Sequence, residues 1–156
     1  MDYPAAIGAG LIGGTAMVAI LYMGILMMPG QMKMNLLYML GSTMFGERVM
    51  AYMSGAMMHA VMSVAFALAH VGVYQAFDLD TNLAAWGLVF GAAHWAVTGM
   101  ALGMMPVMHP QIRNGSLQAP GAFAMGYPMG TAMGFLMLHL MFGVLVAVLY
   151  DAFGSV

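Results

Sequence analysis

The fold is decided by GLIGGTAMVAILYMGILMMP at residues 10–29 and GLVFGAAHWAVTGMALGMMP at residues 87–106. Aligned without a gap, these two stretches are identical at nine of twenty positions, and both end in Met-Met-Pro. Each stretch is long and apolar enough to form a helix across a bilayer core about 30 Å thick. Self-similarity of this kind indicates that an internal segment was duplicated.

The composition favours a membrane protein over a soluble domain. Of the 156 residues, 63% are hydrophobic and 5% are charged, whereas a soluble domain is about a quarter charged. So few charged groups cannot cover a globule, and the remaining surface must face lipid. The net charge of −2 argues against nucleic-acid binding, and the absence of Cys excludes disulfides and thiolate metal sites.

Four runs have the length of a membrane-spanning helix, and they are uncharged apart from Asp151 near the end of the last run. They cover residues 5–28, 49–77, 83–105 and 126–153. The duplication makes the first two runs one hairpin and the last two runs a second hairpin, with both hairpins inserted in the same direction. We therefore predict an all-α membrane protein with a single transmembrane domain over residues 1–156, a tandem repeat of two helical hairpins with approximate twofold symmetry along the membrane normal.

The connections between these runs predict the orientation. A short interfacial helix is expected at residues 35–45, because apolar residues recur there at helical spacing after Asn35, a candidate N-cap. Residues 107–123 are rich in turn-forming residues. All three basic residues, Lys33, Arg48 and Arg113, lie in loops 29–48 and 106–125. The positive-inside rule makes these loops cytoplasmic and puts both termini outside.

Glycine spacing predicts which helix faces meet. In lipid, close packing of small residues does much of the work of joining helices. Pairs of glycines spaced four apart indicate such contacts; they are Gly10/Gly14, Gly87/Gly91, Gly99/Gly103 and Gly126/Gly130/Gly134. The stripe that carries Gly87 and Gly91 continues through His94 and Thr98, and the duplication aligns His94 with Met17. We expect His94 and Met17 to lie at a helix contact.

Histidines are the unexpected polar residues of the spanning runs. Ionisable residues inside a membrane usually face the bundle interior and are candidates for a functional site. At about 1.5 Å per residue, His59, His94, His139 and Met17 all fall near mid-membrane. Imidazole and thioether together suit Cu(I), so these four residues are a candidate metal site. His59, His94 and His139 are alternatively candidate ligands of a haem or a chlorophyll-type pigment.

Other interpretations of these residues stay open. A neutral His can join two helices through a ring N–H without any metal, and a chain of His can also form a proton or ion pathway. We expect His70 to be a hydrogen-bonding residue near the membrane surface and His109 to be a loop residue. Some of the 23 methionines recur at helical spacing and resemble the rows of thioether ligands in Cu(I) transport proteins. Met also fills packing gaps and forms adaptable surfaces.

The sequence predicts no enzymatic activity, because the one carboxylate inside a spanning run, Asp151, lies at the end of the last run and none lies deeper to serve acid–base chemistry. The leading hypothesis is a non-catalytic accessory or scaffold subunit of a larger membrane complex. Its partners would be membrane lipids and other integral membrane subunits or copies of itself, with no nucleic acid. The alternative is an intramembrane protein that binds or handles Cu(I), haem or pigment, and the third hypothesis is a small ion transporter.

A family resemblance supports the architecture. The motif Gly87-Leu-Val-x-Gly-x-x-His94-Trp95, followed by Gly103-Met-Met-Pro-x-Met-His-Pro110 and by His139-Leu-x-Phe-Gly-Val, resembles small uncharacterised bacterial membrane proteins with four helices and a domain of unknown function. The resemblance implies a multi-pass protein of the bacterial inner membrane. It implies no activity.

Overall fold

The chain folds into four long helices joined by shorter helical and irregular segments. The structure is a computed structural model that describes residues 1–154, and that range contains no strand. The long helices are α1 (Tyr3–Met27), α3 (Arg48–Ala76), α4 (Leu83–Met108) and α6 (Met129–Gly154). Each is long and apolar enough to cross a membrane. The prediction of an all-helical chain with four candidate spans is confirmed.

The short helices lie in the two connections that carry the basic residues. They are α2 (Leu36–Gly41), α5 (Pro110–Arg113) and the 3-10 helix η1 (Ala122–Ala124). Asn35 caps α2 as predicted, with its side-chain oxygen accepting from the Tyr38 N–H at 3.3 Å. The Glu47 carboxylate caps α3 by accepting from the N–H groups of Val49 and Met50. These two donors hold the pKa of the Glu47 carboxyl below its usual value.

Three predicted helix boundaries are wrong by about one turn. The short helix predicted at residues 35–45 ends at Gly41, and two long helices differ for local reasons. Pro106 does not end α4, which runs on to Met108. A proline so near the C-terminus of a helix removes only one hydrogen bond. The last helix begins at Met129 rather than at residue 126, because the Gly126 N–H instead donates to the Pro120 carbonyl at 2.6 Å in a preceding turn.

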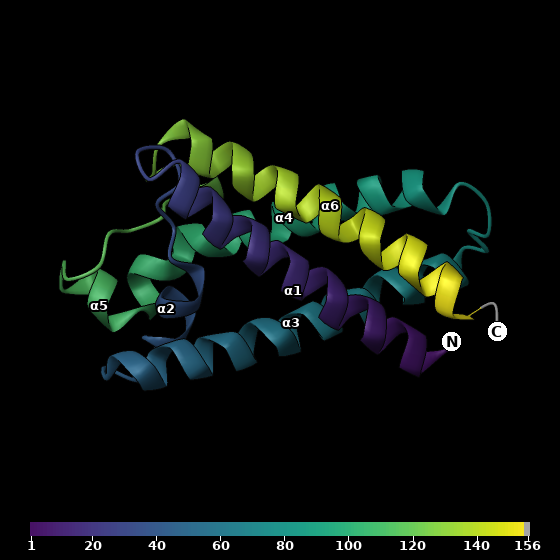
Figure 1. The fold of residues 1–156 in the computed structure, drawn as a ribbon, viewed down its shortest axis with the longest axis horizontal. Coiled ribbons are helices and arrows are strands. Elements are labelled where there is room, and N and C mark those ends of the chain that lie inside the picture. The colour runs from purple at the N-terminus through teal and green to yellow at the C-terminus, as the bar shows by residue number, and fades with distance from the viewer. Residues whose placement is uncertain (155–156) are drawn as a thin grey trace.

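The long helices pack in an order that differs from their order in the chain (Figure 1). Helix α1 packs against both α3 and α6, and α4 packs on α6. Helices α3 and α4, although consecutive, touch only slightly. The N-terminus, the α3–α4 loop and the end of α6 lie at one end of the bundle, and α2 and α5 lie at the other (Figure 1). We refer to these as the acidic end and the basic end, after the charged residues they carry.

The packing does not display the twofold symmetry that the repeat predicts. The repeat makes α1 equivalent to α4 and α3 equivalent to α6, so the α1–α6 interface should have a matching α3–α4 interface. The first is extensive and the second is slight. The internal repeat therefore stays a prediction from the sequence, and the two hairpins pack differently.

Glycines bring α4 and α6 into backbone contact, as their spacing predicts. A Cβ on Gly91 would lie 2.6 Å from the His139 carbonyl oxygen, and one on Gly87 would lie 2.6 Å from the Gly143 carbonyl oxygen. Gly10 and Gly14 bring α1 close to α3 in the same way, where a Cβ on either would collide with Ser63. Backbones at this distance leave no room for any side chain.

Gly99 and Gly103 have a different role from the one predicted. They receive the returning loop rather than another helix, because a Cβ at Gly99 would collide with the Phe123 ring and one at Gly103 would lie 3.2 Å from Ala122. The Phe123 ring also packs on Trp95, with centroids 4.7 Å apart. The turn-rich segment is therefore folded against α4.

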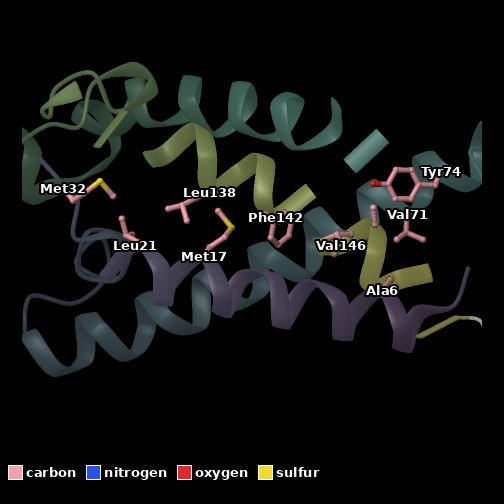
Figure 2. Packing of buried hydrophobic residues seen from close by; sticks show 11 residues of the cluster. Ala6, Met17, Leu21, Met32, Val71, Tyr74, Leu138, Phe142 and Val146 are labelled. Atoms are coloured by element: carbon pink, nitrogen blue, oxygen red, sulfur yellow. The ribbon is translucent and has the colours of Figure 1, made fainter. Parts of the chain in front are cut away.

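The buried apolar residues form one long cluster between α1, α3 and α6. Figure 2 shows its labelled side chains strung along the helices from Met32 to Tyr74. Phe142 and Val146 of α6 are fully buried at its centre. A second cluster at the basic end contains Met34 and Phe135 and joins α2 and η1 to the bundle.

His109 lies in the connection between α4 and α5, as expected for a loop residue, but it is fully buried and has a structural role. Its Nδ1 accepts from the N–H groups of Gln111 and Ile112 and so caps α5. Its Nε2–H donates to the Met39 carbonyl at 2.9 Å. His109 therefore ties α2 to the junction of α4 and α5.

The close approach of α4 and α6 should make Gly91→Ala destabilising. Overpacking of this kind typically costs about 1–3 kcal/mol, which unfolding in mixed detergent micelles, followed by circular dichroism, would measure. Gly46→Ala is the matched control, since nothing lies within 4 Å of a Cβ there. Equal stability of the two variants would contradict the backbone contact.

Replacing His109 should loosen the basic end of the bundle. His109→Ala leaves the N–H groups of Gln111 and Ile112 without their side-chain acceptor and removes one of the two donors to the Met39 carbonyl, and buried unsatisfied groups cost about 1–3 kcal/mol each. The same measurement should show a clear decrease in the free energy of unfolding for this variant. It should show little change for Val107→Ala, because Val107 is 76% exposed. A neutral effect of His109→Ala would exclude the structural role.

Candidate functional site

The four predicted site residues line one cavity, and each comes from a different long helix. Met17 of α1, His59 of α3, His94 of α4 and His139 of α6 all border a cavity of about 170 Å³. We refer to it as the central cavity. Met17, His94 and His139 are buried, and His59 is partly buried. Leu36 and Leu40 of α2 line the cavity at the basic end.

His94 is held by aromatic contacts rather than by hydrogen bonds. Its ring stacks on Phe66 of α3 with centroids 3.6 Å apart, across the region where α3 and α4 otherwise barely meet. Its edge packs against the His139 ring at 4.7 Å. The buried Nδ1 of His94 has no hydrogen-bond partner among residues 1–154. A ring nitrogen left in this state can interact with a ligand without first breaking a protein contact.

His139 is oriented through both of its ring nitrogens. Its Nδ1 lies 2.7 Å from the Phe135 carbonyl, which can only accept, so Nδ1 carries a hydrogen. In the neutral ring, Nε2 then holds a lone pair, which accepts from the Thr98 hydroxyl at 3.0 Å. The arrangement fixes the tautomer that presents Nε2 as a ligand atom.

The Thr98 hydroxyl has a second place to donate. It also lies 2.9 Å from the His94 carbonyl and 3.3 Å from the Trp95 carbonyl of its own helix. When a ligand takes the lone pair of His139, the hydroxyl can turn back to a carbonyl and stay satisfied. Occupation of His139 Nε2 therefore leaves no buried donor unpaired.

Met17 and His59 complete the wall formed by α1 and α3. Met17 lies in the long apolar cluster between Leu21 and Phe142 (Figure 2). His59 also borders a neighbouring pocket of about 160 Å³ with Gly14 of α1 and Ser63 of its own helix. His59 is thus the member of the set with the most freedom to move.

The sequence missed several residues that line the cavity. Their identity strengthens its thioether character, because they include three methionines: Met34, Met62 and Met105. Helical spacing could have suggested Met62, which lies three residues, or about one turn, after His59 on α3. Met34 lies in the connection before α2, where no periodicity marks it.

The expectation that His70 forms hydrogen bonds is wrong, and the residue is buried within the bundle. It is 4% exposed, and neither ring nitrogen has a hydrogen-bond partner among residues 1–154. Its ring packs on the edge of His94 at 5.8 Å and near Phe90 and Phe142. The Tyr74 hydroxyl, one turn further along α3, is equally buried and unpartnered within the described chain.

These unpartnered atoms have an energetic cost. A buried polar group without a hydrogen bond costs about 1–3 kcal/mol. His70, Tyr74 and His94 each carry at least one such group. Native proteins retain such groups where a ligand, an ion or water supplies the partner.

The donor set fits a soft ion better than a hard one. No three His, Cys, Asp or Glu side chains in residues 1–154 are placed to hold a metal by themselves. A metal in the central cavity therefore needs thioether ligands beside imidazole. Cu(I) accepts both, whereas Mg²⁺ and Ca²⁺ prefer carboxylate and carbonyl oxygens.

Comparison of the chain with protein-family models, curated proteins and solved structures finds no match. The residues of the site are therefore the basis for assigning its chemistry.

The hydrogen bond between Thr98 and His139 should contribute to stability. Thr98→Val keeps the shape of the side chain but removes the hydroxyl, and a net loss of about 0.5–1.5 kcal/mol is expected. Thr98→Ser retains the hydroxyl and should stay close to the original protein in the same unfolding measurement. The reverse order of stability would show that His139 does not depend on Thr98.

Proposed function

We propose that this protein is an intramembrane binding protein for Cu(I), with the ion held in the central cavity. The observation that carries the proposal is the convergence of three imidazoles and a thioether, one from each long helix, on one cavity. Imidazole and thioether are ligands that favour Cu(I). A ligand from every helix would make binding dependent on the whole bundle.

The size of the central cavity favours an ion over a macrocycle. Pockets for drug-sized molecules and organic cofactors are about 300–1,000 Å³, whereas this cavity is about 170 Å³. A haem or a chlorophyll-type pigment would require the helices to move apart, although its axial ligands are available. A single ion with its ligands fits without such movement.

His94 and His139 are the residues we expect to bind most directly. His94 offers a buried nitrogen that no protein group uses, and His139 offers Nε2 once Thr98 turns to a backbone carbonyl. Met17 would supply sulfur from the opposite wall, and His59 would supply a third imidazole by a small movement. Two or three of these ligands are enough for Cu(I).

Titration of the detergent-purified protein with Cu(I), under reducing conditions and against a colorimetric chelator, tests the proposal. One ion should bind per chain. The double variant His94→Ala with His139→Ala should weaken binding at least about 100-fold, since even second-shell changes cost 10–100-fold. Met17→Leu should also weaken binding, whereas its matched control Met57→Leu, 66% exposed on α3, should not.

Two results would overturn the Cu(I) proposal. One is the absence of stoichiometric binding to the folded protein, and the other is unchanged affinity in the double variant. A visible absorption spectrum of the protein as purified from cells provides a further check. A haem or pigment absorption band that disappears in the double variant would show that the same residues bind a macrocycle instead of Cu(I).

A second proposed function is that of an accessory subunit in a larger membrane complex. A row of exposed side chains on α3, Met50, Met53, Met57 and Val61, favours it. Methionine surfaces adapt readily to a partner. Migration in a native gel after extraction with mild detergent tests this function, and a monomer of this chain alone would oppose it.

A further inference from the structure

The acidic end of the bundle has a polar pocket that the proposed function does not use. This acidic pocket has a volume of about 440 Å³. Four of the five acidic residues of the chain line it, and they come from three different parts of the chain: Asp2, Asp78, Asp80 and Asp151. No Lys, Arg or His lines the pocket. Its charge should concentrate cations at this end of the bundle.

Tyr74 links the acidic pocket to the interior. It lines the pocket, yet its side chain is only 3% exposed and its hydroxyl has no hydrogen-bond partner among residues 1–154. Tyr74 lies in α3 four residues after His70, which is one turn along the same face. The phenol and the imidazole are therefore consecutive polar groups in an otherwise apolar core.

From His70 the polar groups continue to the central cavity. The His70 ring lies 5.8 Å from the His94 ring, and the His94 ring lies 4.7 Å from the His139 ring. We call Tyr74, His70, His94 and His139 the polar line. The two steps between imidazole rings are therefore both shorter than 6 Å, and most of the buried polar atoms of the polar line lack a protein partner.

Aromatic rings surround the polar line. Phe90 packs on both Tyr74 and His70, and Phe142 packs on both His70 and His94. The faces of aromatic rings attract cations. The polar line therefore favours positive charge over negative charge along its length. The groups responsible are the carboxylates of the acidic pocket, the phenol oxygen, the imidazole nitrogens and the aromatic rings.

We propose that the polar line is a water-accessible route by which a monovalent cation passes from the acidic pocket to the central cavity. The route rests on the proposed function in one respect, since that function supplies the ion and its destination. The route and the proposed function can nevertheless be tested independently, because the accessibility of the polar line can be measured without copper.

Thiol accessibility in proteoliposomes measures the route directly, because the chain contains no cysteine to react in the background. The variants Tyr74→Cys and His70→Cys place a thiol on the polar line. Val71→Cys is the matched control, because Val71 neighbours His70 and is fully buried in the apolar cluster. A positively charged methanethiosulfonate reagent should modify the first two at least about tenfold faster than the control, since thiol reactivity follows exposure.

Charge selectivity tests the role of the acidic pocket. In Tyr74→Cys, the positively charged reagent should react faster than a negatively charged reagent of similar size. Adding Asp78→Asn with Asp80→Asn should remove most of this preference without making the thiol inaccessible. Reaction of His70→Cys no faster than Val71→Cys, or equal rates for both reagents, would overturn the route.

A second measurement leaves the histidines intact. Tyr74→Phe keeps the ring and removes the hydroxyl, so it should slow Cu(I) loading while leaving the equilibrium affinity unchanged. An unchanged loading rate would contradict the route even if the cysteine variants fail to fold. If the original protein binds no Cu(I) but the thiols on the polar line react as expected, the proposed function fails and the route remains.

Discussion

The backbone contact between α4 and α6 is the constraint on which the rest of the arrangement depends. Apolar side chains gain little from leaving lipid, so helices in a membrane associate through close packing. Gly87, Gly91 and Gly143 allow the two backbones to meet where any side chain would collide. This contact sets His94 beside His139. The wall of the central cavity formed by α4 and α6 is therefore positioned by glycine contacts between the two backbones, and not by the size of the side chains that line the cavity.

The opposite wall is looser, which explains why a cavity exists at all. Helices α3 and α4 touch only slightly, and the stacked Phe66 and His94 rings are the closest aromatic contact between them. The space beside this stack is lined by imidazole and thioether groups among apolar side chains, and α2 contributes Leu36 and Leu40 at the basic end. One tight interface and one open interface together produce a site that a symmetric bundle would not have.

Much of the fold could be predicted, because it follows from hydrophobic length. The four spans, the Asn35 cap and the glycine contacts of α4 are visible in the sequence. The convergence of Met17, His59, His94 and His139 followed from their depth alone. What could not be predicted depends on tertiary contacts: the burial of His70, the use of His109 to tie α2 to α5, and the docking of Phe123 on Gly99. Sequence spacing also could not show that the two hairpins pack differently.

The order in which the helices pack has a consequence for biosynthesis. The backbone of α4 lies close to that of α6 and approaches those of the helices made before it hardly at all, so its contact with α3 is made by aromatic side chains. Until α6 has been synthesised, His94 can stack on Phe66 of α3 but lacks His139, the neighbour that packs against its other side in the finished bundle. The glycine face of α4 can therefore reach its final contact only after the last long helix has been made, and assembly of the site is coupled to completion of the bundle.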